Sequence, residues 1–362
     1  MSYYYDIMED IRAYPDAWCY IIFGGRNTGK TYSTLKGSQD ENINFVYVKR
    51  TVKDVQLICA GMRGKNFKNI SADIDLSPFK SINRDTGSNV RAVQVFDGLG
   101  AFFNCDDEGN PEGSPVGYIL ALSAITKFKG FDLSDCDWFI FDEFVPKIYD
   151  RVLRGEGEEV LDLYKTISRD REHRGKPPLK LIALANADNA SCALTNTLEI
   201  TDQIVKMSME NAAISYDAAR GIFIHRLIDN LTFKEKEAQS AIYKAMRDTN
   251  WGRMSLDNEF GFNDFSNVTK INLKGCAPYC SFRHKNRTFY VYLKNDTGQF
   301  FITESRFNQK TLHYDLNREN DQKRFYVEQV VDIRAACIDN RAVFSTYTLY
   351  DLIINYQKFY KV

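Results

Sequence analysis

The stretch that decides the fold is Tyr20-Ile21-Ile22-Phe23-Gly24-Gly25-Arg26-Asn27-Thr28-Gly29-Lys30-Thr31. Four apolar residues predict a buried strand, and the eight residues after them match the phosphate-loop pattern G-x-x-x-x-G-K-[ST]. Glycines let such a loop curl, so that backbone N–H groups and the start of the next helix surround a phosphate. A plain glycine turn is the alternative, but the strand before it and the helix-compatible residues after it favour a nucleotide site.

Each residue of this loop is predicted to line the phosphates of a bound nucleotide. These residues are Gly24, Gly25, Arg26, Asn27, Thr28, Gly29, Lys30 and Thr31. Lys30 supplies a positive charge to the outer phosphates, and the hydroxyl of Thr31 is placed to bind Mg²⁺. The loop therefore predicts a nucleoside triphosphate and Mg²⁺ as ligands.

A second apolar run, from Trp138 to Phe141, ends in the acids Asp142 and Glu143. An acid at the tip of a buried parallel strand lies where Mg²⁺ sits beside Thr31, so Asp142 is the predicted metal residue. Glu143 is the predicted general base, which polarises the attacking water. Acids also end strands simply because solvent begins there, and the pattern gains its meaning from the phosphate loop that precedes it.

The same residues indicate which nucleotide reaction is expected. The guanine-selecting N-K-x-D segment of GTPases is absent, and Asn186-Ala187-Asp188 lacks the lysine. A phosphotransferase would not need an acid such as Glu143 to activate water. The sequence therefore favours ATP and hydrolysis coupled to mechanical work.

Short apolar strands alternate with helical stretches up to about residue 200, which predicts an α/β fold with a parallel sheet. The expected strands are Trp18 to Phe23, Asn44 to Val48, Val90 to Phe96, Ala101 to Asn104, Tyr118 to Ala121, Trp138 to Phe141 and Lys180 to Leu184. Helices are expected at Tyr32 to Gly37 and Glu159 to Arg169, with a loop from Asp106 to Pro115.

The later part of the chain predicts a second, smaller α/β domain. The expected organisation is a P-loop NTPase domain of the ASCE type at residues 1–200, a linker at 201–230 and a C-terminal domain at 231–362. The expected elements after residue 230 are a helix at Phe233 to Arg247, strands at Tyr279 to Arg283, Thr288 to Leu293 and Gln299 to Thr303, and helices at Lys323 to Ile338 and Leu349 to Phe359.

Composition narrows the class of protein. The 362 residues carry 47 Lys and Arg against 48 Asp and Glu, for a net charge of −1, so a contact with DNA would depend on local basic patches. The N-terminus lacks a signal-peptide pattern, and no apolar run approaches the roughly 18 residues of a membrane-spanning helix. We expect a cytoplasmic protein that does not bind a membrane.

The sequence resembles the DNA-encapsidation ATPases of small short-tailed phages, which are relatives of the large terminase motors. The segments that carry the resemblance are GGRNTGKT at 24–31, VYVKRT at 46–51, GYILALSAITKFKG at 117–130, WFIFDEF at 138–144, YKTISR at 164–169 and LANA at 184–187. The resemblance covers the N-terminal half well and the C-terminal domain loosely.

The resemblance implies partners and a location. It implies a homo-oligomeric, pentameric ring seated on the portal of a viral capsid, with double-stranded DNA as its substrate. A structural RNA is left open as a further partner. The protein would work in the host cytoplasm, transiently docked on the procapsid.

The resemblance also implies roles for polar residues that follow the strand ending in Asp142 and Glu143. Arg169 is the expected arginine finger, acting in trans on a neighbouring subunit's nucleotide, with Arg171 and Arg174 as weaker candidates. Asn186 is expected to sense the γ-phosphate. The alternatives are a solvated basic helix end and an ordinary turn asparagine.

Other basic residues of the first domain keep two interpretations each. Arg26 could pair with Glu143 or touch phosphate, or be an exposed loop residue. Lys49, Arg50 and Lys53 could line the nucleotide or a subunit interface, or form a solvated face.

The resemblance to terminases also implies an RNase-H-like fold for the C-terminal domain, and its residues predict that this domain does not cut DNA. The predicted strand interiors are apolar, aromatic or basic, whereas Glu304 and Asp315 lie at ends or in loops. Basic residues near one hairpin could instead hold a phosphate backbone or a structural RNA, or be ordinary turn charges: Arg283, His284, Lys285, Arg287 and Lys294. Two other functions stay open, a terminase with an active nuclease and a nucleotide-dependent assembly switch.

Overall fold

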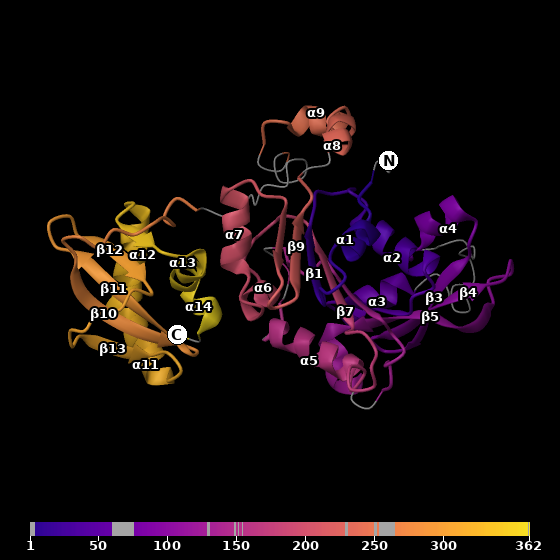
Figure 1. Cartoon of the computed structure of the whole chain (residues 1–362), viewed down its shortest axis with the longest axis horizontal. Coiled ribbons are helices and arrows are strands. Elements are labelled where there is room, and N and C mark those ends of the chain that lie inside the picture. The colour runs from indigo at the N-terminus through magenta and orange to yellow at the C-terminus, as the bar shows by residue number, and fades with distance from the viewer. Residues whose placement is uncertain are drawn as a thin grey trace. The chain divides into compact units, whose positions relative to one another are not determined.

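The computed structural model divides the chain into two compact units (Figure 1). The structure describes residues 4–59, 76–128, 131–147, 150, 152–153, 155–228, 231–249, 252, 265–360 and 362. The first unit comprises Met1–Leu198 and Lys206–Gly261, and the second comprises Glu199–Val205 and Phe262–Val362. The expected boundary at residue 200 therefore differs from the structure, which continues the first unit by about sixty residues beyond it.

Among the described residues, the first unit holds a nine-stranded sheet in the order β3-β4-β5-β2-β6-β7-β1-β9-β8. The strands are β1 Cys19–Phe23, β2 Phe45–Lys49, β3 Val90–Phe96, β4 Leu99–Cys105, β5 Pro111–Ala121, β6 Trp138–Asp142, β7 Lys180–Ala185, β8 Ile214–Asp217 and β9 Ile222–Arg226. Pairing is parallel from β5 through β9, and antiparallel at both margins. The expected α/β fold with a sheet rich in parallel strands is confirmed.

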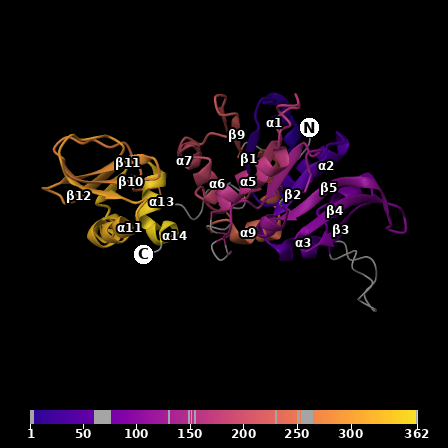
Figure 2. The same cartoon turned by 90° about the horizontal axis from the view of Figure 1, so that it is seen from below.

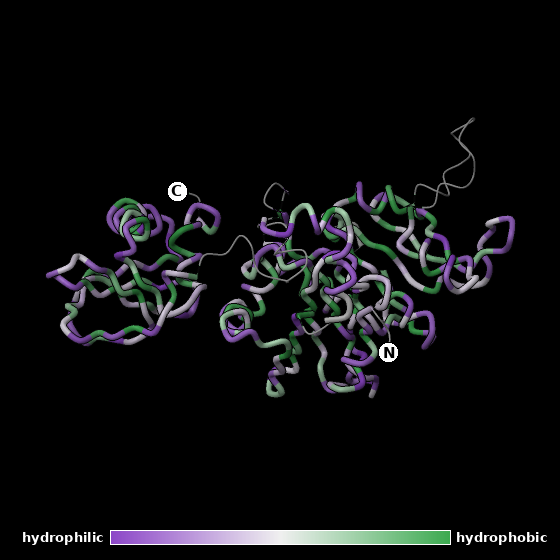
Figure 3. Tube along the Cα trace, turned by 90° about the horizontal axis from the view of Figure 1, so that it is seen from above, coloured by the Kyte–Doolittle hydropathy of each residue, from purple (hydrophilic) through white to green (hydrophobic). Residues whose placement is uncertain are grey.

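The central strands are apolar because both faces of the sheet are covered. Every residue of β1 is buried, as are the first four residues of β6. Parallel strands that are buried on both faces read as continuous apolar runs, which is why the sequence pattern located them. Figure 3 shows the hydrophobic stretches inside and the hydrophilic ones in the outer loops.

Helices connect these strands. They are α1 Ile7–Ala13, α2 Lys30–Asp40, α3 Val52–Ile58, α4 Lys80–Thr86, a 3-10 helix at Leu122–Phe128, α5 Glu156–Ser168, α6 Ala193–Thr197, α8 Leu231–Glu237 and α9 Ala241–Met246. The helix α7 Thr201–Met209 is divided between the units, since residues 201–205 belong to the second. None of the described helices has the length and the apolar character that crossing a membrane requires.

The expected linker at 201–230 is wrong for most of its length, since it contains α7, β8 and β9; residues 229 and 230 lie outside the described residues. The reason is that β9 pairs in parallel with β1 and is buried throughout, although it contains the polar residues His225 and Arg226. The guanidinium of Arg226 donates to the carbonyl oxygens of Met207 (2.9 Å) and Ala212 (3.3 Å). These two bonds engage one nitrogen of a charged group that the sequence pattern did not indicate as part of a buried strand.

Two further elements differ from expectation. The strand β5 begins at Pro111, so the expected loop is shortened to a turn in which the carboxylate of Asp106 accepts from the backbone N–H of Asn110 at 2.7 Å. The single helix expected at 233–247 is two short helices, α8 and α9, which are interrupted at residues 238–240.

The second unit has its own five-stranded sheet, in the order β13-β10-β11-β12-β14. Its elements are β10 Ala277–His284, β11 Arg287–Lys294, β12 Gln299–Thr303, β13 Leu312–Asp315, α11 Glu319–Phe325, a π-helix at Tyr326–Val330, α12 Val331–Ile338, β14 Ala342–Phe344, α13 Tyr347–Ile354 and α14 Tyr356–Phe359. Figure 2 shows α11, α13 and α14 on one side of this sheet. Buried side chains of the sheet and of the helices form one apolar core. The expected hairpin and helices are confirmed, whereas β13 and β14 were not anticipated.

Candidate nucleotide site

The phosphate loop follows β1 and leads into α2. Its backbone bends at Asn27 and Gly29, where φ is 61° and 91°. Gly24 lies in a crowded position, because a Cβ there would be 2.8 Å from Leu227 and 2.9 Å from the Thr28 hydroxyl. The loop therefore needs a glycine at 24 for close packing and another at 29 for a left-handed conformation.

Lys30, the first residue of α2, is buried within the loop. Its ammonium donates to the carbonyl oxygens of Gly24 (2.9 Å) and Gly25 (2.7 Å), and to the side-chain oxygen of Asn186 at 3.4 Å. Burial lowers the pKa of Lys30 to about 8, against the opposing charge of Asp142. A buried cation that is held only by neutral oxygens favours the arrival of an anion such as a phosphate.

The predicted metal residues lie next to each other. The Thr31 hydroxyl donates to Oδ1 of Asp142 at 3.2 Å, which joins the start of α2 to the end of β6. The other carboxylate oxygen accepts from the phenol of Tyr47, and Lys49 lies 3.4 Å from it. Hydroxyl and carboxylate oxygens are the donors that Mg²⁺ prefers, so this pair fits the ion.

Glu143 occupies the turn after β6, in a left-handed conformation with φ of 56°. Its carboxylate forms an ion pair with Lys49 at 2.8 Å. Partial burial opposes ionisation, but the charge and the hydrogen bond of Lys49 outweigh it, so the pKa of Glu143 lies below its ordinary value. The partner of Glu143 is therefore Lys49, and Arg26 makes no bond to it among the described residues.

A buried ion pair between Arg50 and Glu156 stabilises the turn that carries Glu143. Arg50 donates from Nε and from one terminal nitrogen to the two carboxylate oxygens of Glu156, both at 2.9 Å. The same terminal nitrogen donates to the carbonyl oxygens of Glu143 (3.3 Å) and Phe144 (3.1 Å). Arg50 is thus neither a solvated residue nor a nucleotide contact, whereas Lys53 is exposed on α3.

Asn186 follows β7, which lies between β6 and β1, so its side chain reaches Lys30. Asp188, two residues later, is half-buried, and burial raises its pKa although the charges of Arg26, Lys147 and Lys30 oppose the shift. Asn186 thus lies beside Lys30, and its role as a γ-phosphate sensor stays a prediction.

The three arginines after α5 have different environments. Arg169 is partly exposed and donates to Asp132 (3.2 Å) and to the carbonyl oxygen of Phe131 (2.7 Å). Arg171 is buried and bonds to the carboxylate of Asp137 and to backbone carbonyls, so it has a structural role. Arg174 forms an exposed pair with Asp170 at 2.8 Å.

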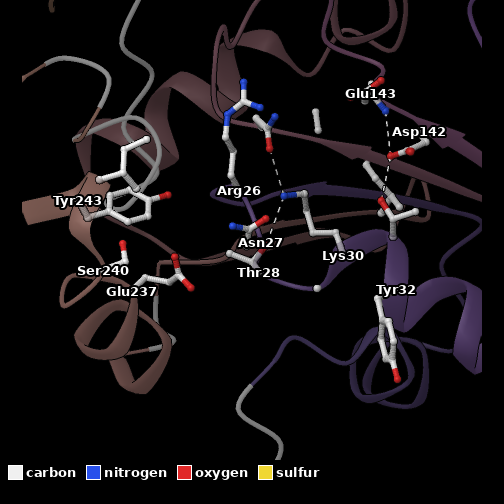
Figure 4. A pocket seen from close by; sticks show the side chains of 16 residues that line it. Arg26, Asn27, Thr28, Lys30, Tyr32, Asp142, Glu143, Glu237, Ser240 and Tyr243 are labelled. Atoms are coloured by element: carbon white, nitrogen blue, oxygen red, sulfur yellow. Dashed lines mark hydrogen bonds between the residues drawn. The ribbon is translucent and has the colours of Figure 1, made fainter. Parts of the chain in front are cut away.

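The phosphate loop, Asp142, Glu143 and Asn186 line a cavity of about 590 Å³, the size of pocket that takes a small ligand. Figure 4 shows Lys30 at its centre, with Asp142 and Glu143 on one side. The opposite wall comes from α8 and α9 through Glu237, Ser240 and Tyr243. No motif or spacing in the sequence marks the residues of this wall, so they could not be predicted from it.

The basic residues of the second unit surround the β10–β11 hairpin, and several have partners. Arg287 pairs with Glu304, and Lys294 lies 3.8 Å from Asp296. His284 is half-buried and bonds to the phenol of Tyr360, and burial together with the charges of Lys285 and Arg287 lowers its pKa to about 4. Arg283 and Lys285 are exposed at the hairpin end.

No family model matches the chain, and no curated protein matches it. Among solved structures, it is similar to a chain of the bacteriophage Phi-29 viral genome packaging motor assembly, with a TM-score of 0.62, 16% identity and 99% coverage of both chains. It is also similar to the Phi-28 gp11 DNA packaging motor, with a TM-score of 0.58, 15% identity and coverage of 98% of this chain and 96% of that one. The expected resemblance to phage packaging motors is therefore confirmed at the level of the fold, across both units.

We expect Glu156→Gln to destabilise the first unit, because it leaves the buried guanidinium of Arg50 without a charged partner. Removing one member of a buried ion pair costs about 3–5 kcal/mol. Urea unfolding of the full chain measures the loss. The matched control is Asp170→Asn, which breaks the exposed pair with Arg174 and should leave the unfolding midpoint unchanged; equal shifts in both variants would contradict the role of the buried pair.

Proposed function

We propose that this chain hydrolyses ATP and uses the energy to move double-stranded DNA into a preformed viral capsid. The observation that supports this most directly is the contact between Thr31 and Asp142, 3.2 Å apart, beside a phosphate loop with a buried lysine. The likeness in fold to packaging motors extends over 99% of the chain and supports the packaging role.

Within this proposal, the loop from Gly24 to Thr31 binds the triphosphate through its backbone N–H groups and through Lys30. Thr31 and Asp142 would hold Mg²⁺, which neutralises phosphate charge when it is bound. Asn186 would exchange its bond with Lys30 for one to the outer phosphate.

Glu143 acts as the general base that accepts a proton from the attacking water. The carboxylate is ionised at neutral pH, as a base must be, and the charge of Lys49 that lowers its pKa weakens it as a base until this ion pair opens. The ion pair with Lys49 at 2.8 Å holds the carboxylate in place, so Glu143 has to exchange this partner for water during turnover.

Arg169 is proposed to act in trans within a homo-oligomeric ring, pentameric by resemblance. No described hydrogen bond joins Arg169 to the phosphate loop of its own chain, and its guanidinium lies partly exposed beside Asp132. An arginine in such a position can reach a γ-phosphate from a neighbouring subunit, where it is worth a factor of about 10³–10⁵ in rate.

The second unit is proposed to bind nucleic acid or the portal without cutting DNA, as an inactive RNase-H-like domain. Its two candidate acids have other partners: Glu304 pairs with Arg287, and the Asp315 carboxylate accepts from the backbone and the side chain of Asn317. Nicking of plasmid DNA by the full chain with Mg²⁺ or Mn²⁺ would contradict this proposal and favour an active terminase.

The packaging reaction itself tests the function. Capsids with their portal, this protein and ATP should protect added DNA from nuclease, and omission of ATP should abolish the protection. Duplex DNA should also stimulate steady ATP turnover. Turnover that is indifferent to DNA, together with no protection, would instead favour a nucleotide-dependent assembly switch.

We expect Lys30→Ala and Glu143→Gln to fail at different steps. The first variant loses the charge that binds the outer phosphates, so ATP binding and hydrolysis should both fall. The second should bind ATP near the wild-type affinity and hydrolyse it at least 10²-fold more slowly, since the amide cannot accept the proton from water. Nucleotide binding by titration and phosphate release separate the two effects, and an equal loss of binding would contradict these roles.

We expect Arg169→Ala to retain nucleotide binding in the isolated chain while hydrolysis collapses in the assembled ring. Mixing it with Glu143→Gln tests the arrangement, because some interfaces of a mixed ring then contain both intact halves. Turnover should rise above that of either variant alone. Arg174→Ala removes the weaker candidate, which pairs with Asp170, and should keep normal turnover if Arg169 is the residue that acts in trans. The absence of recovery at every mixing ratio would place Arg169 outside the trans site.

A further inference from the structure

The wall of the cavity opposite the acids has no role in the chemistry described above. It comes from the turn between α8 and α9, through Glu237, Ser240, Ile242 and Tyr243. In Figure 4, Glu237, Ser240 and Tyr243 lie on one side of Lys30, and Asp142 and Glu143 lie on the other. If Lys30 and Asp142 bind the outer phosphates and the metal, the nucleoside end of the ligand extends toward this wall.

Ser240 presents an unused hydrogen-bonding group on this wall. It occupies the N-cap position of α9, yet its hydroxyl does not cap the helix. The Oγ atom is buried and has no hydrogen-bond partner in the described part of the chain. A buried hydroxyl without a partner costs free energy, and a ligand that bonds to it in the cavity would remove that cost.

Tyr243 and Ile242 supply apolar surface beside this hydroxyl. Both residues line the cavity, where Tyr243 is largely buried (4% exposed) and Ile242 is 54% exposed. Aromatic side chains bind bases of any kind by contact between the faces of the rings, and an exposed aliphatic group completes such a slot.

Glu237 adds an acceptor at the same wall. Its side chain is half-buried, and no hydrogen bond or ion pair engages the carboxylate within the described residues. An ionised carboxylate only accepts hydrogen bonds, so its partners in a nucleotide are hydroxyl or amino groups and never the phosphates. The two ribose hydroxyls are such donors.

We propose that the segment from Glu237 to Tyr243 forms the nucleoside half of the nucleotide site and selects ribonucleoside triphosphates. Tyr243 and Ile242 pack against the base, the Ser240 hydroxyl bonds to its polar edge, and Glu237 accepts from the ribose hydroxyls. This inference rests on the proposed binding of a nucleotide at the phosphate loop. It assigns to α8 and α9 the recognition of the part of the ligand that the loop does not contact.

The test compares three ligands on the full chain: ATP, 2′-deoxy-ATP and inorganic tripolyphosphate, which lacks the nucleoside. Tyr243→Leu should weaken ATP binding about tenfold, because a base loses its aromatic contact, while tripolyphosphate binding stays unchanged. Glu237→Ala should abolish the preference for ATP over 2′-deoxy-ATP, which we expect to be about tenfold in the wild type. Tyr243→Phe keeps the ring and should restore near-normal ATP affinity.

The control variant is Glu235→Ala, which removes an exposed acid of the same helix that does not line the cavity. Unchanged tripolyphosphate binding shows that each variant is folded around an intact loop. If the wild type binds ATP and the Tyr243 and Glu237 variants bind all three ligands as it does, the inference is overturned while the proposed function stands. If the wild type binds neither ATP nor tripolyphosphate, the proposed function fails and the inference fails with it.

Discussion

The candidate site depends on the parallel pairing of β6, β7 and β1, which are buried on both faces. Strands in this environment cannot carry charged side chains along their length, so the polar residues appear where the strands end. Parallel strands end at the same edge of the sheet, and this places Thr31, Asp142 and Asn186 together although they are up to 155 positions apart. The sheet register thus determines the geometry of the site before any ligand arrives.

The carboxylates of Asp142 and Glu143 are held in place by basic groups outside the phosphate loop. Lys49 lies between the carboxylates of Asp142 and Glu143, and these two charges raise its pKa although burial opposes the shift. Behind them, the ion pair of Arg50 and Glu156 fixes the carbonyl groups of the turn that carries Glu143 in its left-handed conformation. A strained residue at such a turn persists only when neighbouring bonds over-determine it, and these bonds do so here.

The second unit has a hydrophobic core of its own. Its sheet and its helices share aromatic and aliphatic side chains such as Phe282, Phe325 and Tyr356. Two of the basic residues in its β10–β11 hairpin lie beside acids, since Arg287 pairs with Glu304 and Lys294 lies near Asp296. Fewer positive charges are therefore unpaired than the sequence indicates. Arg283 and Lys285 of the same hairpin are both exposed.

The sequence by itself determined the phosphate loop, the acids after β6, the α/β class and most buried strands, because these features depend on local patterns of glycine, charge and apolar runs. Only the tertiary structure decided that Arg50 is buried against Glu156, that Arg171 is structural, and that the polar strand β9 belongs to the main sheet. It also decided that Ser240 and Tyr243 face the phosphate loop. Each of these facts depends on a contact between residues far apart in the chain, and such contacts leave no periodic pattern that a single sequence can display.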